Sequence, residues 1–193
     1  MSPPVICFLR HGETEGGVRY WGHTDVALTA RGMQQMREAT SGHSYDRIVS
    51  SPLVRCRTFA EDLSLRDNLA MHVEPRFAEM DFGRWSGRDT AEIMANEADA
   101  LCRFWQDPVR HPPPGGETLG AVAARVLAAC RDLIGGTANR RTLVVTHGGP
   151  IRVLLCLLQG LPINRALKIE VPHASLHNIC PGELARFCAT VEP

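Results

Sequence analysis

In Val5-Ile6-Cys7-Phe8-Leu9-Arg10-His11-Gly12, a continuous apolar run leads straight into an arginine and a histidine. Such a run is typical of a strand buried on both faces, as in a parallel sheet covered by helices. A second run, Thr142-Leu143-Val144-Val145-Thr146, likewise ends directly in His147. Ligands of open α/β sheets bind at the carboxyl ends of the strands. The two strand ends are therefore expected to meet at one functional edge.

Strand-like and helix-like segments alternate around these two runs. Further strands are expected at 46–50 and 71–73, and helices after Thr29 up to Gly42, from Ser51-Pro52, over 90–101, from Leu119 to Gly135, and over 151–159. The chain is expected to close with a hairpin of two strands, 176–180 and 184–189, joined by Pro181-Gly182. This alternation predicts an α/β fold, a three-layer sandwich with a mostly parallel central sheet flanked by helices.

The length of 193 residues fits one domain, and we expect residues 1–193 to form it. The periodic pattern weakens from about residue 84 to residue 114, where Pro112-Pro113-Pro114 precedes two glycines. We interpret this segment, 84–114, as an insertion that covers the active site.

Composition excludes several functional classes. Lys plus Arg and Asp plus Glu are both 21, so the net charge gives no reason to expect nucleic acid or a membrane surface as partner. No apolar stretch is long enough to span a bilayer. The seven cysteines never form C-x-x-C, which indicates free thiols in a reducing, cytoplasmic setting. No cofactor is expected, and His173 and His177, four apart without a carboxylate beside them, are not interpreted as metal ligands.

The residues near the strand ends favour an anionic ligand. Arg10 precedes His11, and Arg57 follows near the expected start of a helix. One guanidinium group can bind two phosphate oxygens at once, and a helix N-terminus adds a favourable field for an anion. A lone histidine at a strand end is more often a structural residue, so this argument depends on the arginines and on His147.

Five blocks, in order, strongly resemble the histidine phosphatase superfamily, in its phosphoglycerate-mutase-like branch. They are Arg10-His11-Gly12-Glu13-Thr14; Gly22-His23-Thr24-Asp25 with Leu28, Thr29 and Gly32; Ser51-Pro52-Leu53 with Arg55, Arg57 and Thr58; Glu79-Met80-Asp81-Phe82-Gly83-Arg84-Trp85-Ser86-Gly87; and Thr146-His147-Gly148-Gly149-Pro150-Ile151-Arg152. They extend over almost the whole chain, and five blocks in order are far more specific than one Arg-His-Gly.

The resemblance implies a phosphoglycerate-mutase-like fold and a metal-independent phosphatase. His11 would attack phosphorus and become phosphohistidine, while Arg10, Arg57 and His147 hold the phosphoryl oxygens. Glu79 would protonate the leaving oxygen and then deprotonate the attacking water. Gly148, Gly22 and Trp21 are further candidates for contact with phosphate or substrate; Asp25, Trp85 and Arg152 are expected to be structural.

The compact chain, the Phe82–Arg88 stretch and Pro113–Thr118 resemble the α-ribazole-5′-phosphate phosphatase group, which acts in cobalamin biosynthesis. The substrate would then be a small phosphomonoester, and the protein a monomer or homodimer. Two departures stand near His11: Gly17 where many relatives have asparagine, and Trp21, which could stack on a flat leaving group or simply pack on its loop. Alternatives are a cofactor-dependent phosphoglycerate mutase, a broad-specificity sugar-phosphate phosphatase, and a non-catalytic phosphate- or phosphoprotein-binding module.

Overall fold

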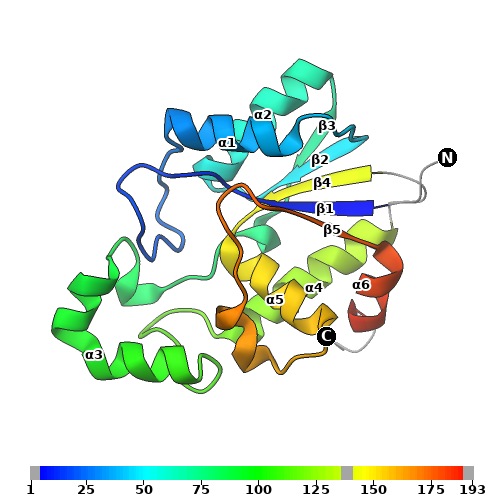
Figure 1. Ribbon diagram of the computed structural model, residues 1–193. Helices are drawn as coiled ribbons and strands as arrows, with labels where there is room; N and C mark the ends of the chain where they lie inside the picture. The colour runs from blue at the N-terminus through cyan, green and yellow to red at the C-terminus, as the bar shows by residue number, and fades with distance from the viewer. Residues whose placement is uncertain (1–4, 136–140, 189–193) are drawn as a thin grey trace.

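A computed structural model describes residues 5–135 and 141–188, and it contains a five-stranded sheet (Figure 1). The strands are β1 (Val5–Arg10), β2 (Arg47–Ser50), β3 (Ala70–Val73), β4 (Arg141–Thr146) and β5 (Leu176–Ile179). They lie in the order β3-β2-β4-β1-β5, with β5 antiparallel to β1 and the other pairs parallel. The prediction of a mostly parallel sheet is confirmed.

Helices cover both faces of the sheet, which makes the three-layer sandwich that the sequence predicts (Figure 1). One face carries α1 (Ala30–Thr40) and α2 (Val54–Asp67), and the other carries α4 (Leu119–Gly135), α5 (Gly148–Leu158) and α6 (Pro181–Cys188). The remaining helix, α3 (Thr90–Gln106), lies apart from the sheet, beyond the carboxyl ends of its strands. Short turns of 3-10 helix span Pro75–Phe77, Gly83–Trp85 and Ile163–Lys168.

Strand β1 shows why the layers form. Ile6 and Phe8 pack in the core beneath α4 and α5, whereas Cys7 and Leu9 pack in the core beneath α1 and α2. Side chains alternate between the faces of a strand, so a strand that is apolar throughout must be covered twice. All four side chains are fully buried, and burial contributes about 1.5–3 kcal/mol for each large one. His11 follows this strand directly, so the packed core fixes the backbone that leads into it.

The expected C-terminal hairpin is wrong, because the second of its strands is helix α6. Pro181 occupies the first helical position, where a missing N–H costs nothing. The Glu183 carboxylate accepts the Cys180 backbone N–H at 3.2 Å, which caps the helix start. Leu184 and Cys188, four residues apart, are buried against the core. The helical spacing of these two residues outweighs the turn suggested by Pro-Gly.

Three other helix boundaries differ from expectation. Helix α2 begins at Val54, after Ser51-Pro52, and α5 begins at Gly148, immediately after His147. Helix α3 continues to Gln106 through a kink at Glu97. Gly136 and the last residue of the expected hairpin, 189, lie outside the described residues. No helix in the described ranges is both long and apolar enough to cross a membrane.

Candidate active site

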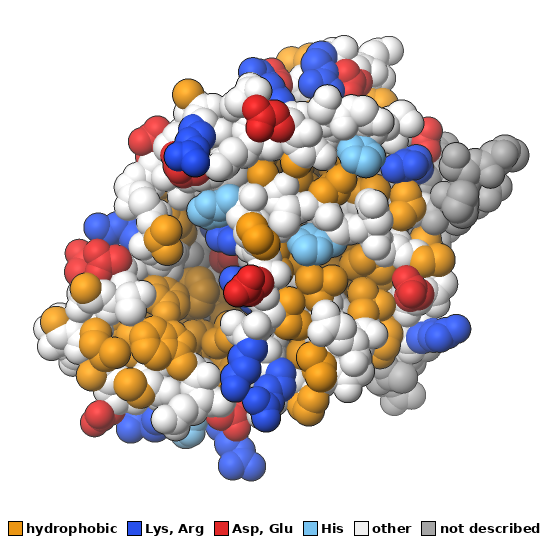
Figure 2. Space-filling model, viewed as in Figure 1, with side chains coloured by type: hydrophobic (Ala, Val, Ile, Leu, Met, Phe, Trp, Pro, Cys, Tyr) orange, Lys and Arg blue, Asp and Glu red, His pale blue; other side chains and the backbone are white. Residues whose placement is uncertain are grey.

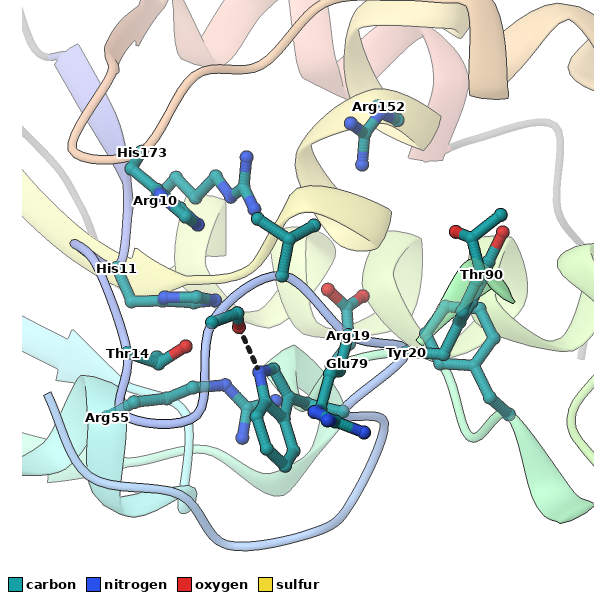
Figure 3. A pocket seen from close by; sticks show the side chains of 14 residues that line it. Arg10, His11, Thr14, Arg19, Tyr20, Arg55, Glu79, Thr90, Arg152 and His173 are labelled. Atoms are coloured by element: carbon teal, nitrogen blue, oxygen red, sulfur yellow. Dashed lines mark hydrogen bonds between the residues drawn. The ribbon is translucent and has the colours of Figure 1, made fainter. Parts of the chain in front are cut away.

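A pocket of about 230 Å³ opens at the carboxyl ends of β1 and β4 (Figure 3). Figure 2 shows the surface hollowed here, with hydrophobic side chains gathered on the α3 side of the hollow. The pocket is lined both by polar side chains from distant parts of the chain and by aromatic side chains. The lining residues are Arg10, His11, Thr14, Gly17, Val18, Arg19, Tyr20, Trp21, Arg55, Glu79, Phe82, Thr90, Arg152 and His173.

His11 follows β1 directly and is 5% exposed. Its Nδ1 lies 2.8 Å from the carbonyl oxygen of Gly12. A carbonyl only accepts hydrogen bonds, so Nδ1 carries the ring proton and Nε2 is left with a free lone pair. Burial, together with the positive charges of Arg55 and Arg10, holds the pKa of His11 well below its usual value. The geometry therefore provides a neutral imidazole with an available nitrogen.

Two guanidinium groups flank His11, that of the buried Arg55 and that of the partly buried Arg10 (Figure 3). Arg10 donates from Nη1 to the carbonyl of Val171, while its buried Nε has no hydrogen-bond partner among the described residues. Burial lowers the pKa of Arg10 to about 10, so it remains charged at neutral pH. Burial also lowers the pKa of Arg55, which is 1% exposed. An unpaired donor on a buried charge costs free energy, and an anion in the pocket would satisfy it.

The structure corrects the expectation that Arg57 lies at the site: Arg55, and not Arg57, lines the pocket. Arg57 forms an ion pair with Glu61 at 3.3 Å, and its side chain is 45% exposed. Residues two apart on a helix differ by about 200° in direction, so only one of the two arginines can face the pocket. A signal was present in the sequence: Phe59, four residues after Arg55, is apolar and buried, whereas the corresponding partner of Arg57 is the charged Glu61.

Backbone carbonyls of the second sequence block hold Arg55 in place. Its Nη1 donates to Thr24 at 2.9 Å and its Nη2 to Gly22 at 2.8 Å. Gly22, expected at the phosphate, thus acts through Arg55 and does not line the pocket. Its φ of +52° and the nearness of Ser86 Oγ explain the glycine. Asp25 accepts the backbone N–H of Val54 at 2.7 Å, a structural role as expected.

His147 lies immediately behind this arrangement and is fully buried. Its ring centroid is 5.2 Å from that of His11. Arg55 Nε donates to Nδ1 of His147 at 3.2 Å, so the ring proton is on Nε2, which donates to Ser51 Oγ at 2.7 Å. Burial holds its pKa well below the usual value. Both nitrogens are thus engaged with protein groups, and His147 supports Arg55 directly.

Glu79 lies across the pocket from His11 (Figure 3). Its Oε1 accepts two backbone N–H groups, from Met80 at 2.9 Å and from Gly149 at 3.0 Å. The absence of a side chain at Gly149 is required, because a Cβ there would collide with that oxygen. Oε2 makes no hydrogen bond to any residue in the described ranges. One carboxylate oxygen is therefore fixed by the backbone and the other is available to a ligand.

Aromatic residues also line the pocket. Trp21 donates from Nε1 to the carbonyl of Gly17 at 3.1 Å (Figure 3), and the guanidinium of Arg19 lies 6.0 Å from the Trp21 ring centre. Tyr20 packs edge-on against Phe82, with ring centres 5.0 Å apart. Trp21 therefore both packs on its own loop and lines the pocket, so the two interpretations of this residue are compatible.

Sequence reasoning missed several lining residues. Arg152, expected to be structural, lines the pocket while its Nε donates to Ile169 at 3.0 Å. His173 lies with its ring centre 5.5 Å from that of His11. Gly148, expected at the phosphate, is buried at the start of α5, and a Cβ there would meet the Arg152 guanidinium. Trp85 is fully buried in the core, as expected. No pattern in the sequence marked His173, which comes near His11 through the pairing of β5 with β1.

His177 and His173 do not form a pair at one site. His177 lies on β5 opposite Phe8 and its Nε2 is 2.9 Å from Ser175 Oγ. Within residues 5–135 and 141–188, no three His, Cys, Asp or Glu residues are grouped in a way that could hold a metal ion.

Comparison with known proteins gives consistent matches. Phosphoserine phosphatase 1 of Hydrogenobacter thermophilus is 30% identical over 175 residues, 88% of this chain and 83% of that protein. The adenosylcobalamin/alpha-ribazole phosphatase of Escherichia coli K12 is 32% identical over 165 residues, 81% of this chain and 80% of that protein. The solved structure of a mycobacterial glucosyl-3-phosphoglycerate phosphatase superposes with a TM-score of 0.80 at 30% identity, covering 90% of this chain and 88% of that one.

These relatives share a superfamily, although their names differ in substrate. A family model described as histidine phosphatase superfamily, branch 1, matches residues 6–188. The family contains phosphomonoesterases and mutases that work without a metal ion. The chain therefore belongs to branch 1 of the histidine phosphatase superfamily.

Proposed function

We propose that this chain hydrolyses a small phosphomonoester through a phosphohistidine intermediate on His11. The observation that carries the proposal is the juxtaposition of a neutral His11, with Nε2 free, and two guanidinium groups, the partly buried Arg10 and the buried Arg55. Phosphoryl transfer needs chiefly positioning and stabilisation of charge on the equatorial oxygens. The unpaired Nε of Arg10 supports an anion at this end of the pocket.

The two half-reactions use Glu79 in opposite directions. In the first, Nε2 of His11 forms a bond to phosphorus, the bond to the leaving oxygen breaks, and protonated Glu79 gives that oxygen its proton. In the second, a water oxygen bonds to phosphorus, the N–P bond breaks, and Glu79 takes the proton from that water. Inorganic phosphate leaves and both side chains return to their starting states.

The other site residues expected from the sequence have indirect roles in this proposal. His147 orients Arg55 through Nδ1, and it reaches a phosphoryl oxygen only by releasing Ser51. Gly22 fixes Arg55 through its carbonyl, and Gly148 gives space to Arg152. Segment 84–114 contributes Thr90 to the pocket, which supports our proposal that it shapes the substrate end.

For the leaving group, we propose a flat ring system, and α-ribazole 5′-phosphate is the candidate. Trp21, Tyr20 and Phe82 provide aromatic side chains in the lining of the pocket. Stacking on an aromatic residue contributes about 1–3 kcal/mol for a nucleobase. The similarity to a relative named for alpha-ribazole supports this choice, while relatives named for phosphoserine and glucosyl-3-phosphoglycerate define the competing substrates.

The test is release of inorganic phosphate, with a metal chelator present, from α-ribazole 5′-phosphate, phosphoserine, 3-phosphoglycerate and 4-nitrophenyl phosphate. We expect turnover, highest kcat/KM for the first, and an acid-labile phosphoprotein that mass spectrometry places on His11. His11→Ala should lose at least about 1,000-fold in kcat, as expected for removal of a nucleophile. His72→Ala, an exposed histidine on the edge strand β3, is the matched control.

Each alternative has its own outcome in this assay. Full activity of His11→Ala would overturn the nucleophile assignment. Interconversion of phosphoglycerates that depends on a bisphosphate primer would indicate a mutase. Binding of phosphate without turnover of any substrate would indicate the non-catalytic module. Retention of Glu79 in contact with two backbone N–H groups is an observation that favours the enzyme, since a binder has no need of a proton carrier.

A further inference from the structure

Arg125, on the second turn of α4, binds the backbone of the segment that ends in Glu79. Its Nη1 donates to the carbonyl oxygens of Arg76 at 2.7 Å and Ala78 at 2.8 Å. Its Nη2 donates to the carbonyl oxygen of Glu79 itself at 3.0 Å. One guanidinium thus binds three carbonyls within four residues.

The same guanidinium is fixed by a carboxylate. Arg125 Nε lies 2.7 Å from Glu117 Oε1 and Nη2 lies 2.9 Å from Glu117 Oε2, a bidentate pair. The two side chains are only 19% and 17% exposed. Glu117 is also joined to Asp81, whose carbonyl accepts its backbone N–H at 2.8 Å. A shielded bidentate pair has a defined geometry, unlike a pair of exposed long side chains.

We propose that Arg125 is a positioning residue for the proton transfer performed by Glu79. The argument rests on the proposed function, in which Glu79 gives a proton to the leaving oxygen. The backbone of Glu79 follows the short 3-10 turn Pro75–Phe77 and belongs to no strand or helix. Its carbonyl depends on side-chain donors, Arg125 and Nε2 of His23 at 2.9 Å. Release of these bonds would let the carboxylate drift from the leaving oxygen, and a displacement of 1 Å can cost about 100-fold in rate.

This role predicts a dependence on the leaving group that a general loss of stability would not produce. An alkyl alkoxide needs a proton as it leaves, whereas 4-nitrophenolate is stable as an anion and does not. The measured quantity is kcat/KM, because it reports on transfer to the enzyme and departure of the leaving group. We expect Arg125→Met to lower kcat/KM about 30-fold for phosphoserine and less than about threefold for 4-nitrophenyl phosphate.

Two further variants separate positioning from folding. Glu117→Gln keeps the three carbonyl bonds of Arg125 but weakens its anchor, so the same selective loss should be smaller. Arg131→Met is the matched control: Arg131 lies on the same helix and also binds a backbone carbonyl, that of Cys188 at 2.8 Å. It should lower the melting temperature without changing the ratio of kcat/KM between the two substrates.

The outcomes distinguish this inference from the proposed function. Turnover by the unmodified protein, with equal losses for both substrates in Arg125→Met and Glu117→Gln, would overturn the positioning role alone. Unchanged kinetics in both variants would do the same. Absence of turnover by the unmodified protein would overturn the proposed function and the inference together. If Arg125→Met fails to fold, the ratio measured for Glu117→Gln decides.

Discussion

Two parts of the pocket lining, the group around His11 and the loop that carries Trp21, are built in different ways. Around His11, which we call the phosphoryl end after the proposed function, Arg10 is the last residue of β1 and His11 follows it directly. Arg55 is held there by two backbone carbonyls and His147. The second part, which we call the rim, is the loop over residues 16–21. It has positive φ at Gly16 and Gly17 and carries Trp21. Val18 beside them is 87% exposed.

Several contacts connect the rim to the segment before α3. Tyr20 exchanges backbone hydrogen bonds of 2.9 Å with Gly87 and Arg88, and the Arg19 side chain adds further contacts. Arg19 donates to Glu92 at 2.7 Å and to the carbonyl of Gly87 at 3.1 Å, and lies 3.6 Å from Asp89. Glu92 and Asp89 also form the capping box that begins α3. These contacts are partly exposed ion pairs, which contribute little each. The phosphoryl end is therefore supported by the core of the fold. The rim is supported by the surface contacts of Arg19 and by the backbone hydrogen bonds and ring packing of Tyr20.

Within this comparison, the largest expected effect comes from replacing each of the two arginines of α2 with alanine in turn. Arg55→Ala should lower kcat/KM at least about 100-fold for every substrate, because a preorganised charged donor is lost from the phosphoryl end. Arg57→Ala should change it less than about twofold, since loss of an exposed ion pair affects neither pocket nor core. Steady-state kinetics on 4-nitrophenyl phosphate, with melting temperatures to verify folding, measures both.

The same two variants can also contradict the assignment of Arg55. A large loss in Arg57→Ala, with Arg55→Ala nearly unchanged, would restore the assignment made from the sequence. It would also mean that the orientation of α2 differs in the working enzyme.

The choice between Arg55 and Arg57 illustrates what the sequence could and could not predict. The buried strands that end in Arg10-His11 and in His147 follow from hydrophobic pattern alone, because a parallel sheet imposes one simple rule on its strands. The choice between Arg55 and Arg57 required the starting residue of α2, and helix starts are uncertain by a few residues. An error of one residue changes the direction expected for each side chain on the helix by more than a quarter turn. Family blocks contain both arginines and do not by themselves separate them.

Contacts from distant loops were beyond reach for a different reason. His173 lies near His11 only because β5 runs antiparallel beside β1 and the chain returns over the strand end. Arg152 points into the pocket because Gly148 leaves space for it. Neither position has a local pattern that marks it, since both depend on tertiary packing.

An intermediate effect is expected at the rim. Trp21→Ala should lower kcat/KM about tenfold for α-ribazole 5′-phosphate, through loss of a stacking surface, and less than about threefold for 3-phosphoglycerate. The small substrate is the internal control, because it shares the phosphoryl group and lacks the ring. Equal losses for both would show that Trp21 supports the loop only, and that the rim does not select flat leaving groups.

The smallest expected effect concerns His173, whose ring centre lies 5.5 Å from that of His11. Burial, assisted by the charge of Arg10, lowers the pKa of His173 to about 4. The unfolded chain, with an ordinary histidine pKa near 6.5, therefore binds more protons than the folded one as pH falls from about 6.5 toward 4. Stability from this group is present above that window and is lost as the pH descends through it.

His173→Gln removes that contribution to the pH dependence. Between pH 7 and pH 5, the free energy of unfolding should fall about 1 kcal/mol less in this variant than in the unmodified protein. Urea denaturation at both pH values measures the difference, and His72→Gln, on the exposed edge strand, controls for the loss of a histidine as such. His11 and His147, whose pKa values burial also depresses, still contribute to the remaining slope. A variant that keeps the full slope would place His173 with the solvated rim, and would confine the desolvated part of the pocket to the phosphoryl end.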